Sequence, residues 1–369
     1  MRQARANVSR VFPLSSLAAA ALLAVVVLLA ARLPRPASIA PMLQWTALAS
    51  PLGWFLLGAV LGPGLGLLDR ALLEAAAPVI AVAVGWVTAR AAAELASHAT
   101  PGERPASHLL GTVGAFLVPA VLLLAAAHWL LTPSTQEWMV LGPIVATVVA
   151  ALALAGTAAP GQAAAGSMVL AATALVALLL PQAGLADLKR VAMWLGYAIG
   201  GAILCAALAA RLAHGGSLAG TIAALCLGAG IGTASGASPM VVCALMGFGL
   251  SRWSIPHARL AGELALHEPT VAAVLWTTAG AAVGGPLATV GVAAVLVALW
   301  PLGRRIAAGV GPMDSTLGLA LAVNFVLMSA RESGELERAV PTIVAFGLLL
   351  VRVTSQRLTP AARRIEVSV

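Results

Sequence analysis

A stretch of 49 residues, from Trp138 to Ala186, contains no Asp, Glu, Lys, Arg or His. It consists of two apolar runs on either side of a break, TAAPGQAAAG. Because a helix needs about 20 apolar residues to cross a bilayer, this stretch is long enough for two crossings in succession. A charge at the centre of either crossing would cost about 2.5–3.5 kcal/mol. The sequence therefore predicts a pair of adjacent membrane helices here.

The composition extends this prediction to the whole chain. Hydrophobic residues make up 61% and charged residues 9% of the 369 positions, and the mean hydropathy is +0.99. Soluble domains have about 25% charged residues, so we expect an all-α polytopic membrane protein whose main partner is the lipid bilayer. The net charge of +8 is explained by basic residues at helix ends, and we expect no nucleic-acid partner. Three cysteines in apolar segments lack any metal-type spacing and indicate buried small residues.

About thirteen apolar segments divide the chain. They cover residues 12–31, 45–68, 72–92, 108–131, two runs within 138–186, and 191–212, 217–234, 239–250, 269–283, 286–302, 315–330 and 339–353, followed by a short tail at 357–369. A polar kink from Thr233 to Ser238 separates the segments at 217–234 and 239–250. The first segment follows three arginines and is either a retained helix or a signal peptide; we favour the retained helix.

The distribution of basic residues predicts the orientation. With thirteen crossings, eight Lys and Arg lie on the side of the N-terminus and thirteen on the other side. The positive-inside rule then places the C-terminus in the cytoplasm of a multi-pass protein of the cell (inner) membrane. The three arginines of the N-terminus argue for the opposite orientation.

Several segments, taken in order, carry a resemblance to a known family. They are GWFLLGAVLGPGLGLLD with its Gly-Pro turn, EPTVAAVLWTTAGA, WPLGRRIA, and the final STLGLALAVNFVLMSARESGELERAVPTIVAFGLLLVRVTS. In this order the segments resemble the monovalent cation:proton antiporter superfamily, which has the sodium/proton exchanger fold. The resemblance spans nearly the whole chain, and its evidence is the order of the pieces.

The resemblance implies two inverted repeats, about 45–183 and 217–356, within a transmembrane domain at 1–356. It implies two interrupted crossing helices, whose counterparts here are Pro143 to Thr147 and the surroundings of Asn324. It also implies a core domain and a panel domain, with alternating access by movement of one against the other. The family forms a homodimer through the panel domain, and the resemblance implies the same here. Interrupted helices of this kind meet the transported ion near the midplane of the membrane.

The chain departs from the family where the family's chemistry resides. Members that exchange ions have one or two Asp in the helix after the first interrupted one, and this chain has Ala171, Ala172 and Thr173 there. Where many members have a basic residue before a Pro-x-Gly, this chain has Trp300. The remaining candidates for substrate binding are the neutral oxygens of Thr147, Thr173 and Asn324, which suit a monovalent cation or a small solute.

Some ionisable residues lie near the apolar segments. Glu263, His267 and Glu268 precede the segment at 269–283 and are weak candidates for a proton or cation relay; the alternative is a solvated helix start, where acidic residues are favoured. We interpret Glu74 and Arg90 as interfacial side chains that extend outward. Motifs for an enzyme, a metal or a cofactor are missing from the sequence.

Two hypotheses for function follow. The first is a secondary-transporter-like membrane protein whose substrate and coupling are not identified by the sequence. The second is a transport-inactive relative that acts as a structural or regulatory membrane subunit on the same fold. The missing carboxylates favour the second, and the retained Gly-Pro turns favour a preserved scaffold rather than decay.

Overall fold

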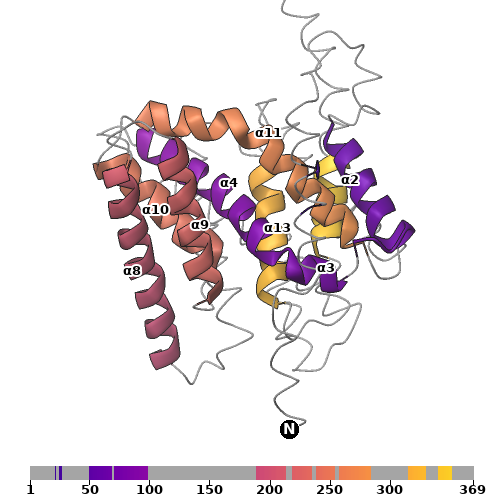
Figure 1. Ribbon diagram of the computed structural model, residues 1–369, viewed down its shortest axis with the longest axis horizontal. Helices are drawn as coiled ribbons and strands as arrows, with labels where there is room; N and C mark the ends of the chain where they lie inside the picture. Colours follow the sequence, from indigo (N-terminus) through magenta and orange to yellow (C-terminus); the bar gives the residue numbers. More distant parts are fainter. Residues whose placement is uncertain are drawn as a thin grey trace, which may run out of the picture.

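The computed structural model describes residues 50–68, 70–98, 188–212, 218–234, 238–253, 257–283, 315–329 and 340–350, together with residues 21, 25 and 26. In these ranges every regular element is helical, which confirms the all-α prediction (Figure 1). The helices are α2 (Pro51–Ala59), a π-helical turn (Val60–Gly64), α3 (Arg70–Ala75), α4 (Ala77–His98), α8 (Leu188–Leu212), α9 (Leu218–Ala234), α10 (Pro239–Trp253), α11 (His257–Ala281), α13 (Ser315–Ser329) and a helix at 340–350. Over the described residues, none of these helices is both long and apolar enough to cross a membrane.

Most predicted segments that fall in these ranges coincide with helices. α8, α9, α10 and α13 begin within three residues of the predicted positions. The predicted segment at 72–92 is divided into α3 and α4 by a turn at Ala76. Pro78 explains the division, because proline cannot donate to the carbonyl of Glu74. The predicted segments at 108–131, 138–186 and 286–302 lie outside the described residues, as does nearly all of the first.

α2 ends as the Gly-Pro pattern predicted. Ser50 caps its N-terminus, with the Gly53 N–H donating to the Ser50 hydroxyl at 3.0 Å. Pro63 cannot donate to the carbonyl of Ala59, and the chain widens into a π-helical turn in which the Leu65 N–H donates to the Val60 carbonyl at 2.8 Å. Gly66 then adopts a φ of 63°, which favours glycine, and the helix ends.

α4 lies at the centre of the described part and contacts α9, α10, α11 and α13. Its residues divide between two hydrophobic clusters. The first core joins one face of α4 to α2, to the second half of α11, to α13 and to the helix at 340–350. The second core joins the other face to α8, α9 and α10. Figure 1 shows α8, α9 and α10 on one side of α4 and α13 and α2 on the other.

Glycines allow helix backbones to meet in both cores. A Cβ on Gly247 of α10 would lie 2.8 Å from the Cα of Ala89 on α4. On the other side, a Cβ on Gly58 would collide with the carbonyl oxygen of Thr277, and one on Gly280 with that of Phe55. An added methyl group has no room at these positions. The backbone of α4 therefore packs directly against that of α10, and the backbone of α2 against that of α11.

α11 begins earlier than the sequence predicted. The prediction placed a loop before Pro269, but the helix starts at His257 and continues through Pro269 to Ala281. Figure 1 shows α11 crossing above the α8–α10 group and then turning down towards α2. Proline in a helix interior removes one hydrogen bond and clashes with the carbonyl four residues earlier, which explains a bend rather than a helix end.

Candidate functional site

Two polar contacts between described helices involve the candidate residues. One is formed where α9 gives way to α10, beside α13, and the other lies between α4 and the first half of α11. Each connects residues that are far apart in the sequence. Together they include two of the six residues that the sequence singled out as candidates, Asn324 and Glu268.

The first contact joins Ser238 to Asn324. The Ser238 hydroxyl donates to the Asn324 side-chain oxygen at 3.0 Å, and both residues are at most 2% exposed. The same hydroxyl accepts from the Met240 N–H at 3.2 Å, so Ser238 caps α10. A Cβ on Gly232 would lie 2.6 Å from the Cα of Pro239, which indicates how closely the ends of α9 and α10 approach. The start of α10 therefore lies against the end of α9 and is held by a buried polar pair.

This arrangement corrects the expectation of a break at Asn324. α13 is an unbroken helix from Ser315 to Ser329, and Asn324 lies within it. No proline lies in α13, and the Asn324 side chain bonds to Ser238 instead of competing for the backbone of its own helix. α10 begins directly after Ser238, the last residue of the polar kink that the sequence showed between its two segments.

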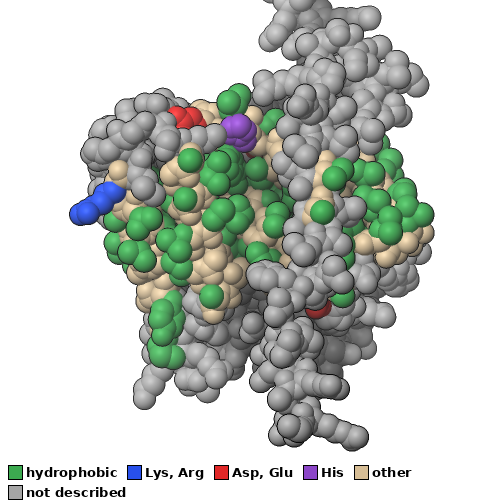
Figure 2. Space-filling model, viewed as in Figure 1, with side chains coloured by type: hydrophobic (Ala, Val, Ile, Leu, Met, Phe, Trp, Pro, Cys, Tyr) green, Lys and Arg blue, Asp and Glu red, His purple; other side chains and the backbone are tan. Residues whose placement is uncertain are grey.

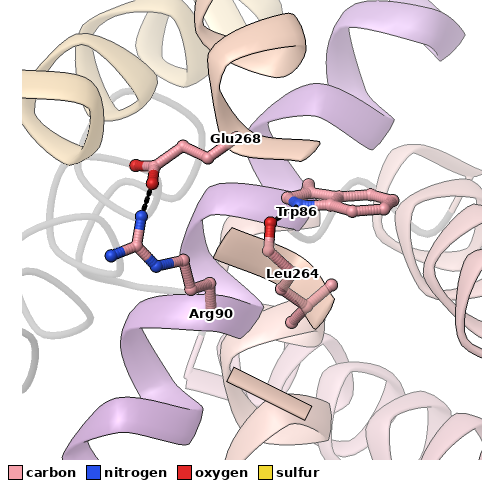
Figure 3. Close-up of polar contacts among 4 residues, drawn as sticks. All are labelled: Trp86, Arg90, Leu264 and Glu268. Atoms are coloured by element: carbon pink, nitrogen blue, oxygen red, sulfur yellow. Dashed lines mark hydrogen bonds and ion pairs between the residues drawn. The ribbon is translucent and has the colours of Figure 1, made fainter. Parts of the chain in front are cut away.

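The second contact is a two-rung connection between α4 and α11 (Figure 3). The indole N–H of Trp86 donates to the Leu264 carbonyl at 3.0 Å, in a buried bond between residues 178 positions apart. One turn further along both helices, Arg90 forms an ion pair with Glu268, and each side chain is 19% exposed. The spacing of four residues on both helices aligns the two rungs.

The candidate relay residues all lie on α11. The ring of His267 meets that of Trp86 edge to face, with centroids 6.0 Å apart. Glu263 is partly buried and Glu268 faces Arg90. The interpretation that Arg90 extends outward is therefore wrong, because α11 continues before Pro269 and its Glu268 pairs with a partly buried Arg90. Glu74 is exposed, as expected.

Thr147 and Thr173 lie outside the described residues. Within the described residues, no group of three or more His, Cys, Asp and Glu could hold a metal ion. The sequence did not single out Trp86. Trp86 lies one helical turn before Arg90, and Leu264 lies one turn before Glu268. This equal spacing is the sequence signal that could have identified Trp86.

Two further hydroxyls are buried in the first core. Thr88 and Thr278 donate to the carbonyls of Val84 and Val274 in their own helices. In contrast, the hydroxyls of Thr277 and Thr342 are fully buried and have no hydrogen-bond partner among the described residues. A buried polar atom without a partner is uncommon and calls for an explanation.

Comparison with known proteins does not assign a family: no protein-family model matches the chain, and no curated protein matches it significantly.

Proposed function

We propose that the chain is a polytopic helical membrane protein of the secondary-transporter type, similar to cation:proton antiporters, which works without the exchange carboxylates of that family. Its substrate class is a monovalent cation held by neutral oxygens, or a small solute. The proposal has two parts, membrane integration and transport, and separate observations support them.

The outward surface of α8 is the main support for membrane integration. One face of this helix packs inward with Ala198, Ala202, Cys205, Ala206 and Ala209. The outward face is also apolar. Its large side chains, which are 41–58% exposed, are Met193, Tyr197, Ile199, Ile203, Leu204 and Leu208. In water a helix normally has a polar outward face, and a contiguous apolar surface of this kind is typical of contact with lipid or a partner.

The exposed apolar surface extends beyond α8. Figure 2 shows hydrophobic side chains spread over the α8 and α9 side of the molecule, with an acidic group along the upper edge of this side and a basic group at its left edge. Ile222 and Leu227 of α9 and Leu245 and Phe248 of α10 add exposed apolar area. A bilayer is the environment that accommodates such faces together with a chain that is 61% hydrophobic.

The transport part rests on polar groups that the apolar cores enclose. Asn324 and Ser238 are buried beside the junction of α9 and α10, and Thr277 and Thr342 hold unpartnered hydroxyls among the described residues. Neutral oxygens can replace part of the hydration shell of a monovalent cation. They cannot exchange a proton for it, because an amide and a hydroxyl do not titrate near neutral pH.

A transport-inactive structural or regulatory subunit is the second candidate, and specific contacts favour it. Glu268, a partly buried carboxylate, is already paired with Arg90. The Asn324 oxygen is already paired with Ser238. Residues that satisfy one another in this way stabilise a scaffold without requiring a ligand.

Proteoliposomes discriminate the two candidates. We expect the purified chain to admit labelled sodium or potassium down an imposed gradient, while a pH-sensitive dye inside the vesicles reports no coupled proton exchange. Asn324→Ala and Ser238→Ala should reduce the flux at least tenfold. Gly230→Ala should leave the flux unchanged, because the position is exposed and an added Cβ would meet no neighbouring atom within 4 Å.

Other outcomes would change the assignment. Absence of flux of either cation from correctly folded protein would favour the inactive subunit. Robust proton exchange that Glu268→Gln abolishes would contradict the neutral-oxygen proposal. It would instead support Glu263, His267 and Glu268 as the proton relay. Release of the chain from membranes by alkaline carbonate would overturn membrane integration itself.

A further inference from the structure

α11 contributes to both cores, one on each side of Pro269. Before the proline, Leu264 is 1% exposed and belongs to the second core. After it, Val274, Leu275 and Trp276 belong to the first core. The two halves of one helix are thus embedded in different packing units, and a change in the angle between those units affects both α11 and the two faces of α4.

Each half of α11 has its own anchor. The second half is held by backbone packing on α2, where Gly280 and Gly58 admit no Cβ. The first half is held on α4 by the bond from Trp86 to Leu264 and the ion pair of Arg90 with Glu268 (Figure 3). The ion pair adjoins the proline directly, since Glu268 precedes Pro269.

Pro269 lowers the resistance of the helix to bending at this position. Its nitrogen cannot donate to the carbonyl of Ala265, so one hydrogen bond of the ladder is missing at the point where the two halves meet. Helix kinks at proline have this cause. The missing bond leaves the angle between the two halves of α11 unconstrained by the helix itself. The contacts with α2 and α4 then set this angle.

We propose that α11 is a hinged lever, with its hinge at Pro269, and that the rungs Trp86–Leu264 and Arg90–Glu268 are the latch that fixes its angle. With the latch formed, the first half moves with α4. With the latch broken, the first half is free to pivot about Pro269 while the second half stays on α2. The inference does not depend on whether the chain carries a solute.

Spin-label distances test the lever directly. Spin labels are attached at Leu56 of α2 and Leu266 of α11, which are 52% and 59% exposed, in protein whose exposed Cys226 is replaced by serine. Because the second half of α11 is held on α2, the distance between these labels reports the angle between the two halves of α11. We expect one narrow distance distribution for the intact latch. The double variant Trp86→Phe with Glu268→Gln should at least double its width. Pro269→Ala with the latch intact should shift the mean, because the restored N–H straightens the helix.

A second pair of labels separates pivoting from general loss of packing. Met193 of α8 and Leu227 of α9, both exposed, lie on helices that the lever does not include. Their distribution should be the same in all variants. The proposal is overturned if the α2–α11 distribution is unchanged in the double variant, or if the α8–α9 pair broadens to the same extent.

Discussion

The two faces of α4 are packed by different means. Towards the first core the helix presents the branched side chains Ile80, Val84 and Val87. Towards α10 it presents Ala81, Gly85 and Ala89, and Gly247 of α10 lies directly on the backbone of Ala89. One face is filled by side-chain volume, and the other is closed by the approach of two backbones.

This difference predicts opposite sensitivities on one helix. A face filled by side chains loses stability when a side chain is made smaller, because a cavity forms. A face closed by backbone approach loses stability when a side chain is made larger, because the helices must separate. In lipid the second arrangement is favoured, since small residues allow helices to approach where the hydrophobic effect does not drive them together.

The largest effect is expected for Gly247→Leu. Even a Cβ at this position would lie 2.8 Å and 3.0 Å from the Cα and carbonyl carbon of Ala89, so α10 must move away from α4. We expect a loss of about 3 kcal/mol or more in the free energy of unfolding, measured by titration with a denaturing detergent. The control is Gly230→Leu, at a position where an added Cβ would meet no neighbouring atom within 4 Å. Equal losses for the two variants would show that backbone approach does not hold this face.

Val84 tests the opposite face. Val84 is fully buried in the first core. Val84→Ala should cost roughly 2 kcal/mol through the cavity it leaves, whereas the single added methylene of Val84→Ile should cost about 1 kcal/mol, the low end of the range for overpacking. The same titration measures both variants. If enlargement proved more damaging than truncation, the contrast between the faces would fail.

The smallest effect is a coupling between Gly85 and Cys243. A Cβ on Gly85 would lie 2.6 Å from the Cys243 sulfur and 3.2 Å from its Cβ. Gly85→Ala should therefore destabilise the protein, and Cys243→Ala, which removes the sulfur, should relieve about 1 kcal/mol of that loss in the double variant. Gly85→Ala with Val84→Ala is the matched comparison. A double-mutant cycle with no coupling would show that the sulfur is not the limiting contact.

The sequence predicted the helical class and most helix positions because apolar runs bounded by proline and polar residues mark helices clearly. α10 starts at Pro239 and α13 at Ser315, as expected. The start of α11 was predicted wrongly, because Pro269 is a common first residue of a helix and the polar residues before it resemble a loop. The helix continues there because Arg90 and Trp86 of α4 supply partners for that polar stretch.

The candidate site was only partly predictable. Asn324 stood out as an amide in an apolar segment that needed a partner, and it has one. Its partner, Ser238, lies 86 residues away, and no local pattern connects two positions at that separation. The pairing of Arg90 with Glu268 was missed for the same reason, since the register between α4 and α11 is a property of the assembled helices.

The bond between Trp86 and Leu264 has a consequence for how the chain is made. At a synthesis rate of about 5–20 residues per second, a separation of 178 residues corresponds to roughly 10–35 s between the appearance of α4 and that of its partner. During that interval Arg90 has no Glu268 to neutralise it, and the indole N–H has no carbonyl from α11. The connection between α4 and α11 can therefore form only after residue 268 of the 369 has been synthesised, and until then the packing of α4 depends on its other contacts.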